Sequence, residues 1–192
     1  NYGSSIFIFE VYDSNAFKDI ENTNSNDKLI VGSFNIASGL NLDIFEQSKQ
    51  AHKHNIELLG LQEVNKYADR TRYDLLNSFS ALRFPHHYFS KSIDFQNGEY
   101  GIGVVSKHEI LESENDMFPP YSTYEDRSYH RVLINKGGRE IALYNTHLSF
   151  ENPYVRLRQM EILKERMMND PAEYVIATGD FNVANGVHEY YF

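Results

Sequence analysis

The chain has 192 residues, no cysteine, no tryptophan, 41% hydrophobic residues and a net charge of −9 from 18 basic and 27 acidic side chains. This length suits one domain, or one domain and a fragment of another, that folds without a disulfide or structural metal. The lack of cysteine excludes disulfides, thiolate zinc sites and cysteine nucleophiles. The acidic charge argues against binding nucleic acid through bulk charge. It permits a metal-dependent enzyme that acts on phosphates, because the metal supplies local positive charge.

No stretch approaches the roughly 20 apolar residues that a membrane helix needs, so we predict no transmembrane segment. The first ten residues lack the basic stretch and apolar core of a signal peptide. We expect a soluble protein, cytoplasmic or secreted, and the sequence leaves the compartment and the oligomeric state open.

Residues 1–27 differ from the rest and are predicted to form an N-terminal extension and linker. Within them, residues 5–12 favour a strand or an apolar arm, and the polar residues 22–27 favour a loop. The extension either docks on the domain or is the tail of a preceding module, and we favour docking. Residues 28–192 are predicted to form the main domain.

From residue 28 onward, strands and helices alternate. Apolar runs predict strands at residues 28–37, 56–64, 87–91, 101–106, 110–117, 128–135, 139–148 and 173–178. Helical periodicity predicts helices at 42–55, at 72–84 and from Pro153 onward, with Phe45, Leu82 and Met160 among the core-facing residues. Gly137 and Gly138 indicate a hairpin turn. These connections predict an α/β domain with helices packed on sheets.

Polar side chains collect just beyond the ends of the buried strands, where open α/β folds bind ligands. A carboxylate there can ligate a hard cation, and magnesium uses only one or two such ligands plus waters. Each residue alone has a structural explanation, such as a turn or a salt bridge. Their shared position favours a functional site made of Asn35, Gln62, Glu63, His147, Asp180 and Asn182.

Four short motifs contain these residues: Ser33-Phe34-Asn35-Ile36, Leu61-Gln62-Glu63-Val64, Asn145-Thr146-His147-Leu148 and Gly179-Asp180-Phe181-Asn182. In this order and approximate spacing, they resemble the endonuclease/exonuclease/phosphatase superfamily of deoxyribonuclease-I-like metal-dependent phosphohydrolases. The resemblance runs from about residue 29 to residue 182. It implies a two-sheet α/β sandwich, with the site where the loops of the two sheets meet.

The resemblance also implies roles for these residues. Glu63 would bind a divalent metal, Mg²⁺ or alternatively Mn²⁺, with Asn35 beside it, and the metal would act as a Lewis acid on the phosphate. Asp180 would orient and activate the attacking water, and Asn182 would fix that water or the phosphate. His147 would donate to a phosphoryl oxygen and stabilise developing charge.

Two further residues match less characteristic positions. Glu99 stands where some relatives place a carboxylate that orients the histidine of the third motif, and its alternative is a solvated hairpin residue. Arg127 stands where relatives present an arginine to the phosphate, and a planar guanidinium suits that task. Its alternative is an ordinary surface salt bridge.

Members of the superfamily continue well past the last of the four motifs, with further strands and a late Asp-His pair. The chain ends soon after Asn182, and His188 is no match because Val187 precedes it. We therefore expect the C-terminal part of the fold to be missing from this sequence. If the sequence is complete, weak or no turnover is expected.

The predicted function is a divalent-metal-dependent hydrolase of phosphoester bonds, either a phosphodiesterase or a phosphatase. Its substrate is expected to be small or lipid-type, because the charge of −9 and the lack of a basic stripe disfavour duplex DNA. The first alternative is a metal-dependent nuclease of the same fold. The second is a catalytically inactive binding module or fragment.

Overall fold

The computed structural model describes residues 6–12, as backbone only, and residues 28–183. Its strands are β1 (Ile6–Tyr12), β2 (Lys28–Asn35), β3 (Leu58–Lys66), β4 (His86–Phe95), β5 (Gly98–Ser106), β6 (Ile110–Met117), β7 (Ser128–Lys136), β8 (Arg139–His147) and β9 (Tyr174–Asp180). Its helices are the short 3-10 helix η3 (Ala37–Gly39), α1 (Ile44–Lys53), α2 (Leu75–Ser80) and α3 (Pro153–Met168). None of these described helices is long and apolar enough to cross a membrane.

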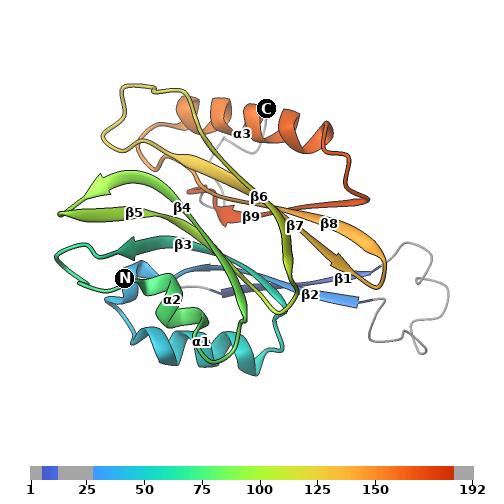
Figure 1. Cartoon of the computed structure of the whole chain (residues 1–192). Helices are drawn as coiled ribbons and strands as arrows, with labels where there is room; N and C mark the ends of the chain where they lie inside the picture. The colour runs from blue at the N-terminus through green and yellow to red at the C-terminus, as the bar shows by residue number, and fades with distance from the viewer. Residues whose placement is uncertain (1–5, 13–27, 184–192) are drawn as a thin grey trace.

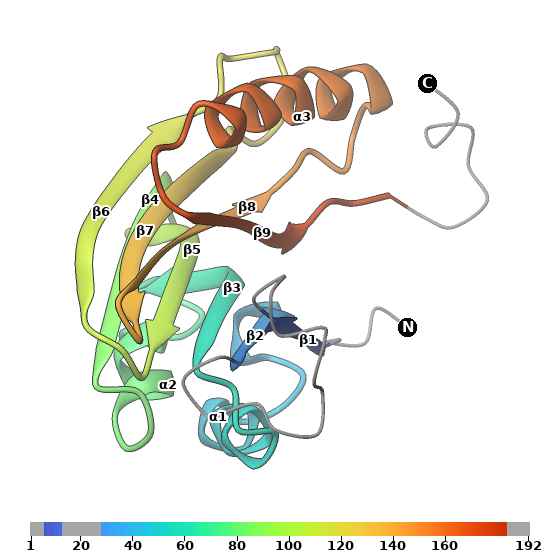
Figure 2. The same cartoon turned by 90° about the vertical axis from the view of Figure 1, so that its right-hand side faces the viewer.

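The strands form two mixed sheets that face each other (Figure 1). The first sheet has the order β1-β2-β3-β5-β4 and the second the order β6-β7-β8-β9. Helices α1 and α2 lie outside the first sheet and α3 lies outside the second (Figure 2). The predicted two-sheet α/β sandwich is confirmed, because each helix buries its apolar side against the outer face of a sheet.

Strand alternation divides the apolar residues among three interfaces. Along β2, Phe34 packs toward α1 and α2, whereas Leu29 and Val31 pack between the sheets. Along β8, Tyr144 packs toward α3, whereas Leu143 packs between the sheets. Successive side chains of a strand point to opposite faces, so the same strands supply both interfaces.

Each sheet contains one parallel pair. Strand β2 runs parallel to β3, and β8 runs parallel to β9. The remaining pairings are antiparallel, so β5 and β7 begin at the end of the sandwich where β3 and β8 finish. The carboxyl ends of β2, β3, β8 and β9 therefore lie at one end of the sandwich. Strands β5 and β7 begin at that same end.

The predicted strands all form, and β4 is longer than expected because Gln96 and Asn97 make a tight turn into β5. Both adopt left-handed backbone angles, with φ of 47° and 60°, as two-residue hairpin turns require. Residues 6–12 form the predicted strand, which pairs antiparallel with β2. The predicted loop at residues 22–27 lies outside the described residues.

Three predicted core positions are wrong. Phe45 is 50% exposed, because α1 instead turns Gln47 and Ser48 inward, where they donate to the carbonyl oxygens of Leu42 and Phe79. Leu82 is 81% exposed, since α2 ends at Ser80 and the helical period does not continue. Met160 is also exposed.

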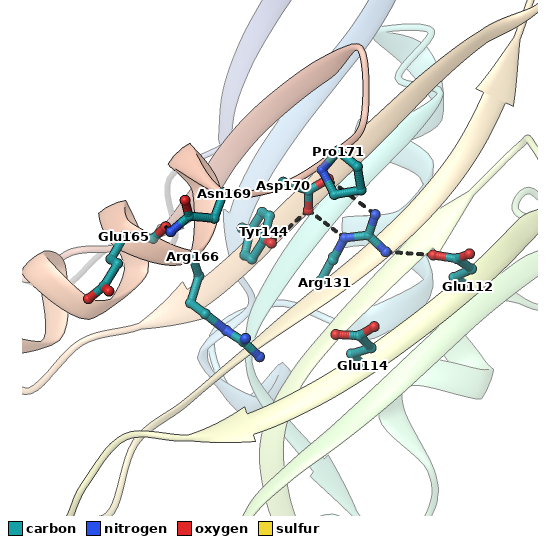
Figure 3. Close-up of a pocket in the computed structure, with 9 residues that line it drawn as sticks. All are labelled: Glu112, Glu114, Arg131, Tyr144, Glu165, Arg166, Asn169, Asp170 and Pro171. Atoms are coloured by element: carbon teal, nitrogen blue, oxygen red, sulfur yellow. Dashed lines mark hydrogen bonds and ion pairs between the residues drawn. The ribbon is translucent and has the colours of Figure 1, made fainter.

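The C-terminal end of α3 is fixed to the second sheet by a buried ion pair (Figure 3). Arg131 of β7 donates from Nε to Asp170 Oδ2 over 2.5 Å and from Nη1 to Glu112 over 2.8 Å. Tyr144 also donates to Asp170, over 2.7 Å. Burial alone would raise the pKa of Asp170, but the hydrogen bonds from Arg131, the Ala172 amide and Tyr144 hold it below its usual range.

A cavity of about 370 Å³ lies over this ion pair, between α3 and the outer face of the second sheet. Its buried charged groups, Arg131 and Asp170, satisfy one another, and the exposed Glu112 also pairs with Arg131. The cavity lies on the opposite face of the second sheet from the predicted site residues.

We expect Asp170→Ala to lower the free energy of unfolding at pH 7 by about 3 kcal/mol, because it removes one partner from a buried ion pair. The folded-state pKa of Asp170 is depressed, so its contribution is present above the unfolded-state value of about 3.9 and is lost as pH falls. Denaturant unfolding of both proteins should show the difference shrinking in acid. Glu114→Ala, at an exposed position of the same cavity, is the control, and an equal loss in both variants would contradict the prediction.

Candidate functional site

Polar residues replace apolar ones on the inter-sheet face as the strands approach their carboxyl ends. On β2, Leu29 and Val31 are followed by Ser33 and then Asn35 on the same face. On β8, Ile141 and Leu143 are followed by Asn145 and His147, and on β9 Ile176 is followed by Thr178 and Asp180. The period of two therefore places the predicted residues of three motifs in the gap between the sheets.

A β-bulge in β3 carries Glu63 at the carboxyl end of the strands. Between the pairs Leu61–Gly103 and Val64–Gly101, β3 has two residues where β5 has one. Leu61 and Val64 consequently face the same helical layer, although three positions separate them. Glu63 is the residue inserted, with φ of 59°, in the left-handed region where bulges re-aim side chains.

The Asn35 amide joins the two carboxylates of the site. Its Nδ2 donates to Glu63 Oε1 and to Asp180 Oδ2, each over 2.9 Å. Its Oδ1 accepts from the Ala37 amide, which fixes the orientation of the side chain. One residue at the end of β2 therefore links a carboxylate of the first sheet to a carboxylate of the second.

Asp180 and Asn182 form a compact turn after β9. Asp180 Oδ1 accepts from the Asn182 amide over 3.0 Å, and Asn182 Nδ2 donates to the Leu148 carbonyl over 2.8 Å. Asn182 has φ of 53°, a conformation that asparagine adopts more readily than most residues. This turn holds both side chains of the fourth motif beside the end of β8.

His147 is buried next to Asp180, with Nε2 3.8 Å from Asp180 Oδ2. Burial and the positive charge of Arg127 lower the pKa of His147 to about 3, against the opposing effect of Asp180. The imidazole is therefore neutral at pH 7, when one ring nitrogen carries a proton to donate. Its Nδ1 has no hydrogen-bond partner within the described part of the chain.

Arg127 lies immediately before β7 with a side chain that is only 3% exposed. Its Nη1 is 3.0 Å from Glu125 Oε1, and its guanidinium carbon lies 5.8 Å from the centre of the Phe150 ring. Arg127 thus lies within electrostatic range of His147, where its positive charge adds to the effect of burial in lowering the pKa of the imidazole. The predicted alternative for Arg127 is an ordinary surface salt bridge. Arg127 does form a salt bridge, with Glu125, but its side chain is buried and not at the surface.

Glu99 does not contact His147. Its carboxylate lies 3.6 Å from the ammonium group of Lys66 and 3.9 Å from that of Lys91, and it is about one-third exposed. Glu99 therefore forms ion pairs at the β4–β5 hairpin, and an orienting role for it stays a prediction.

A hydrogen-bonded cluster centred on Asn145 supports the site from below. Its Oδ1 accepts from Gln62 Nε2 over 2.7 Å and from Thr178 Oγ1 over 3.2 Å. Its Nδ2 donates to the carbonyl oxygens of Leu61 and Gly103, each over 3.0 Å. One buried amide of β8 therefore binds to three other strands, β3 and β5 of the first sheet and β9 of the second.

The residues present fit a weakly ligated hard cation. Glu63 is half-buried, and the Asn35 amide is its one hydrogen-bond donor among the described residues. No group of three or more His, Asp or Glu side chains in this described part could hold a metal ion. A single carboxylate with an adjacent amide matches magnesium, which keeps several waters, better than a closed transition-metal cage.

Sequence reasoning did not find three residues of this region. Glu125 and Phe150 lie in loops without periodicity, and no motif marks them. Tyr100 is buried, and that burial, with the nearby Glu63 and Glu125 charges, raises its pKa. The alternation of β5 could have identified Tyr100, because Val104, Ile102 and Tyr100 share one face.

A sequence model of the Endonuclease/Exonuclease/phosphatase family matches residues 32–190. The chain therefore belongs to this family. No curated protein matches the chain.

Solved structures share the fold. An endonuclease/exonuclease/phosphatase from Beutenbergia cavernae superposes with a TM-score of 0.68 at 18% identity, over 80% of this chain and 47% of that chain. Sphingomyelinase C from Streptomyces griseocarneus gives 0.61 at 20% identity, over 77% and 59%. D. rerio TDP2 with a single-strand DNA product gives 0.61 at 18% identity, over 82% and 62%. The chain thus spans between about half and three-fifths of the length of these proteins.

We expect Asn145→Leu to destabilise the protein by about 3 kcal/mol or more, because it keeps the branched outline of the side chain but leaves several buried donors and acceptors unpaired. Thr178→Val removes one member of the same cluster and should cost only about 1 kcal/mol. Denaturant unfolding of the two variants measures the difference. Equal effects would show that Asn145 is not the centre of the cluster.

Proposed function

We propose that the protein is a divalent-metal-dependent hydrolase of phosphoester bonds, with its reaction centre at Asn35, Glu63, His147 and Asp180. The observation that carries the proposal is the contact of the Asn35 amide with both carboxylates, at 2.9 Å each. Two acidic groups held this close, beside a buried neutral histidine, form an arrangement that a cation and a phosphate would complete.

Each residue has a distinct task in this proposal. Glu63, with Asn35 beside it, holds Mg²⁺ or Mn²⁺, which supplies Lewis acidity to the phosphate. Asp180 orients the attacking water and accepts its proton, and Asn182 fixes that water or a phosphoryl oxygen. His147 donates a hydrogen bond to a phosphoryl oxygen as negative charge develops there.

Arg127 supplies a positive charge to the same phosphate. Its guanidinium is buried, so its attraction for an anion is screened less than that of a surface arginine. Glu99 stays a candidate for a supporting role only, because its carboxylate engages Lys66 and Lys91.

The substrate we favour is a small or lipid-type phosphoester. The net charge of −9 supports this choice over duplex DNA, which binds proteins through released counterions and basic side chains. Hydrolysis of bis-nitrophenyl phosphate, sphingomyelin and plasmid DNA, each with added Mg²⁺, tests the choice. Cleavage of plasmid DNA alone would favour a nuclease, and no hydrolysis by the full-length protein would favour an inactive binding module.

We expect Glu63→Gln to abolish metal-stimulated hydrolysis while the protein stays folded, because the substitution keeps the shape of the side chain and removes its charge. The loss should be about 100-fold or more, since even supporting partners of a metal contribute about 10- to 100-fold. Chelation of the wild type should give the same loss, and added Mg²⁺ should reverse it. Glu140→Gln, at the far end of β8, is the control. Full activity in Glu63→Gln would contradict the metal role.

Asp180→Asn should lower kcat by roughly 10²- to 10⁴-fold and change KM little, because the carboxylate acts on the attacking water. Steady-state kinetics on bis-nitrophenyl phosphate separates the two constants. Asp94→Asn removes an 86% exposed carboxylate from β4 and should change neither. A change confined to KM in Asp180→Asn would assign this residue to substrate binding instead.

A further inference from the structure

Glu125 is a partly buried carboxylate in the loop between β6 and β7, and none of the four motifs contains it. Its side chain is 16% exposed. Its Oε1 forms an ion pair with Arg127 Nη1 at 3.0 Å, without hydrogen-bond geometry. A carboxylate in a phosphate-binding region repels the substrate, so its presence there needs a compensating role. The contact with Arg127 indicates what that role is.

The backbone of Arg127 is hydrogen-bonded, and its guanidinium retains free donor capacity. Its guanidinium lies near the Phe150 ring, and its carbonyl oxygen accepts from the Phe118 amide over 2.9 Å. Its Nε is buried and has no hydrogen-bond partner within residues 28–183. A buried donor without a partner costs free energy, which a phosphoryl oxygen at this nitrogen would recover.

Both members of the Glu125–Arg127 pair lie within electrostatic range of the reaction centre. Burial raises the pKa of Glu125, with Arg127 opposing and the Glu63 carboxylate adding to the rise. Arg127 in turn lowers the pKa of His147. Glu125 is thus within electrostatic range of the proposed metal ligand, and Arg127 is within range of the proposed hydrogen-bond donor.

We propose that Glu125 is a positioning residue, which holds the guanidinium of Arg127 so that its Nε faces the phosphoryl group of the substrate. This inference rests on the proposed phosphoester hydrolase function. Ion pairing on one nitrogen leaves the other donors of the guanidinium free, and the fixed planar geometry then determines where they point. Positioning in advance reduces the entropy lost when the anion binds.

The direction in which Glu125→Gln changes the affinity for phosphate distinguishes a positioning role from a purely electrostatic one. We expect Glu125→Gln to weaken binding of inorganic phosphate, measured by calorimetry with Mg²⁺, by about tenfold, because the ion pair that orients Arg127 is lost. If Glu125 acts only through its charge, the same change removes a repulsion and should tighten phosphate binding. KM for bis-nitrophenyl phosphate should rise with the loss of phosphate affinity.

Glu151→Gln is the matched control. Glu151 is an exposed carboxylate that accepts from the Tyr124 amide in the same loop, and its charge also acts on Glu125. Its substitution removes the same unit of charge and should leave phosphate binding unchanged or slightly tighter. Glu125→Asp keeps the charge but withdraws the carboxylate from Arg127, so it too should weaken binding.

A readout independent of catalysis keeps this proposal separate from the proposed function. The Arg127 Nε–H resonance, assigned by Arg127→Lys, should shift or broaden in Glu125→Gln and Glu125→Asp but not in Glu151→Gln. An unchanged resonance, or tighter phosphate binding in Glu125→Gln, would overturn the positioning role. If the resonance responds as expected but the wild type hydrolyses no phosphoester, the proposed function fails while the Glu125–Arg127 arrangement stands.

Discussion

The hydrogen-bonded cluster around Asn145 determines how the two sheets meet at the candidate site. Helices cover the outer faces, and apolar side chains fill most of the gap between the sheets, but neither sets the register of one sheet against the other. Asn145 does so, because its amide accepts from Gln62 and Thr178 and donates to two backbone carbonyls of the opposite sheet. The close approach also requires Gly60, where a Cβ would lie 2.2 Å from Thr178 Oγ1. A directional contact of this kind specifies one arrangement where apolar packing would tolerate several.

The candidate site carries local features that oppose stability. Glu63 adopts a left-handed backbone, which costs a residue with a Cβ about 1–2 kcal/mol. The Glu63 and Asp180 carboxylates both face one amide nitrogen, and His147 is buried with an unpaired nitrogen within the described residues. Such features persist only where the surrounding structure enforces them, and they gather at functional sites more often than elsewhere. The Asn145 cluster beneath them supplies that enforcement.

The sequence predicted the parts of the fold that depend on short-range pattern. Apolar runs located the strands, and polar residues at their ends identified Asn35, Glu63, His147 and Asp180, which the structure brings together because both strand pairs that carry them are parallel. Patterns failed where a tertiary contact decided the outcome. Helical periodicity predicted Leu82 as a core residue, but periodicity does not indicate that α2 ends at Ser80. The bulge at Glu63 depends on the partner strand, and the pairing of Glu125 with Arg127 depends on a loop. Neither produces a periodic pattern in the sequence.

The distance along the chain between the site residues has a consequence for folding. Asn35 and Asp180 are 145 positions apart, and the hydrogen bonds between Ser33 and Gly179 span 146 positions. Contacts between such distant residues form late, because the loop that they close carries a large entropy cost. The first sheet can assemble from residues 6–12 and 28–106, and the second from residues 110–180, before their ends dock. The acidic centre can then form only when the two sheets dock, because its residues come from both.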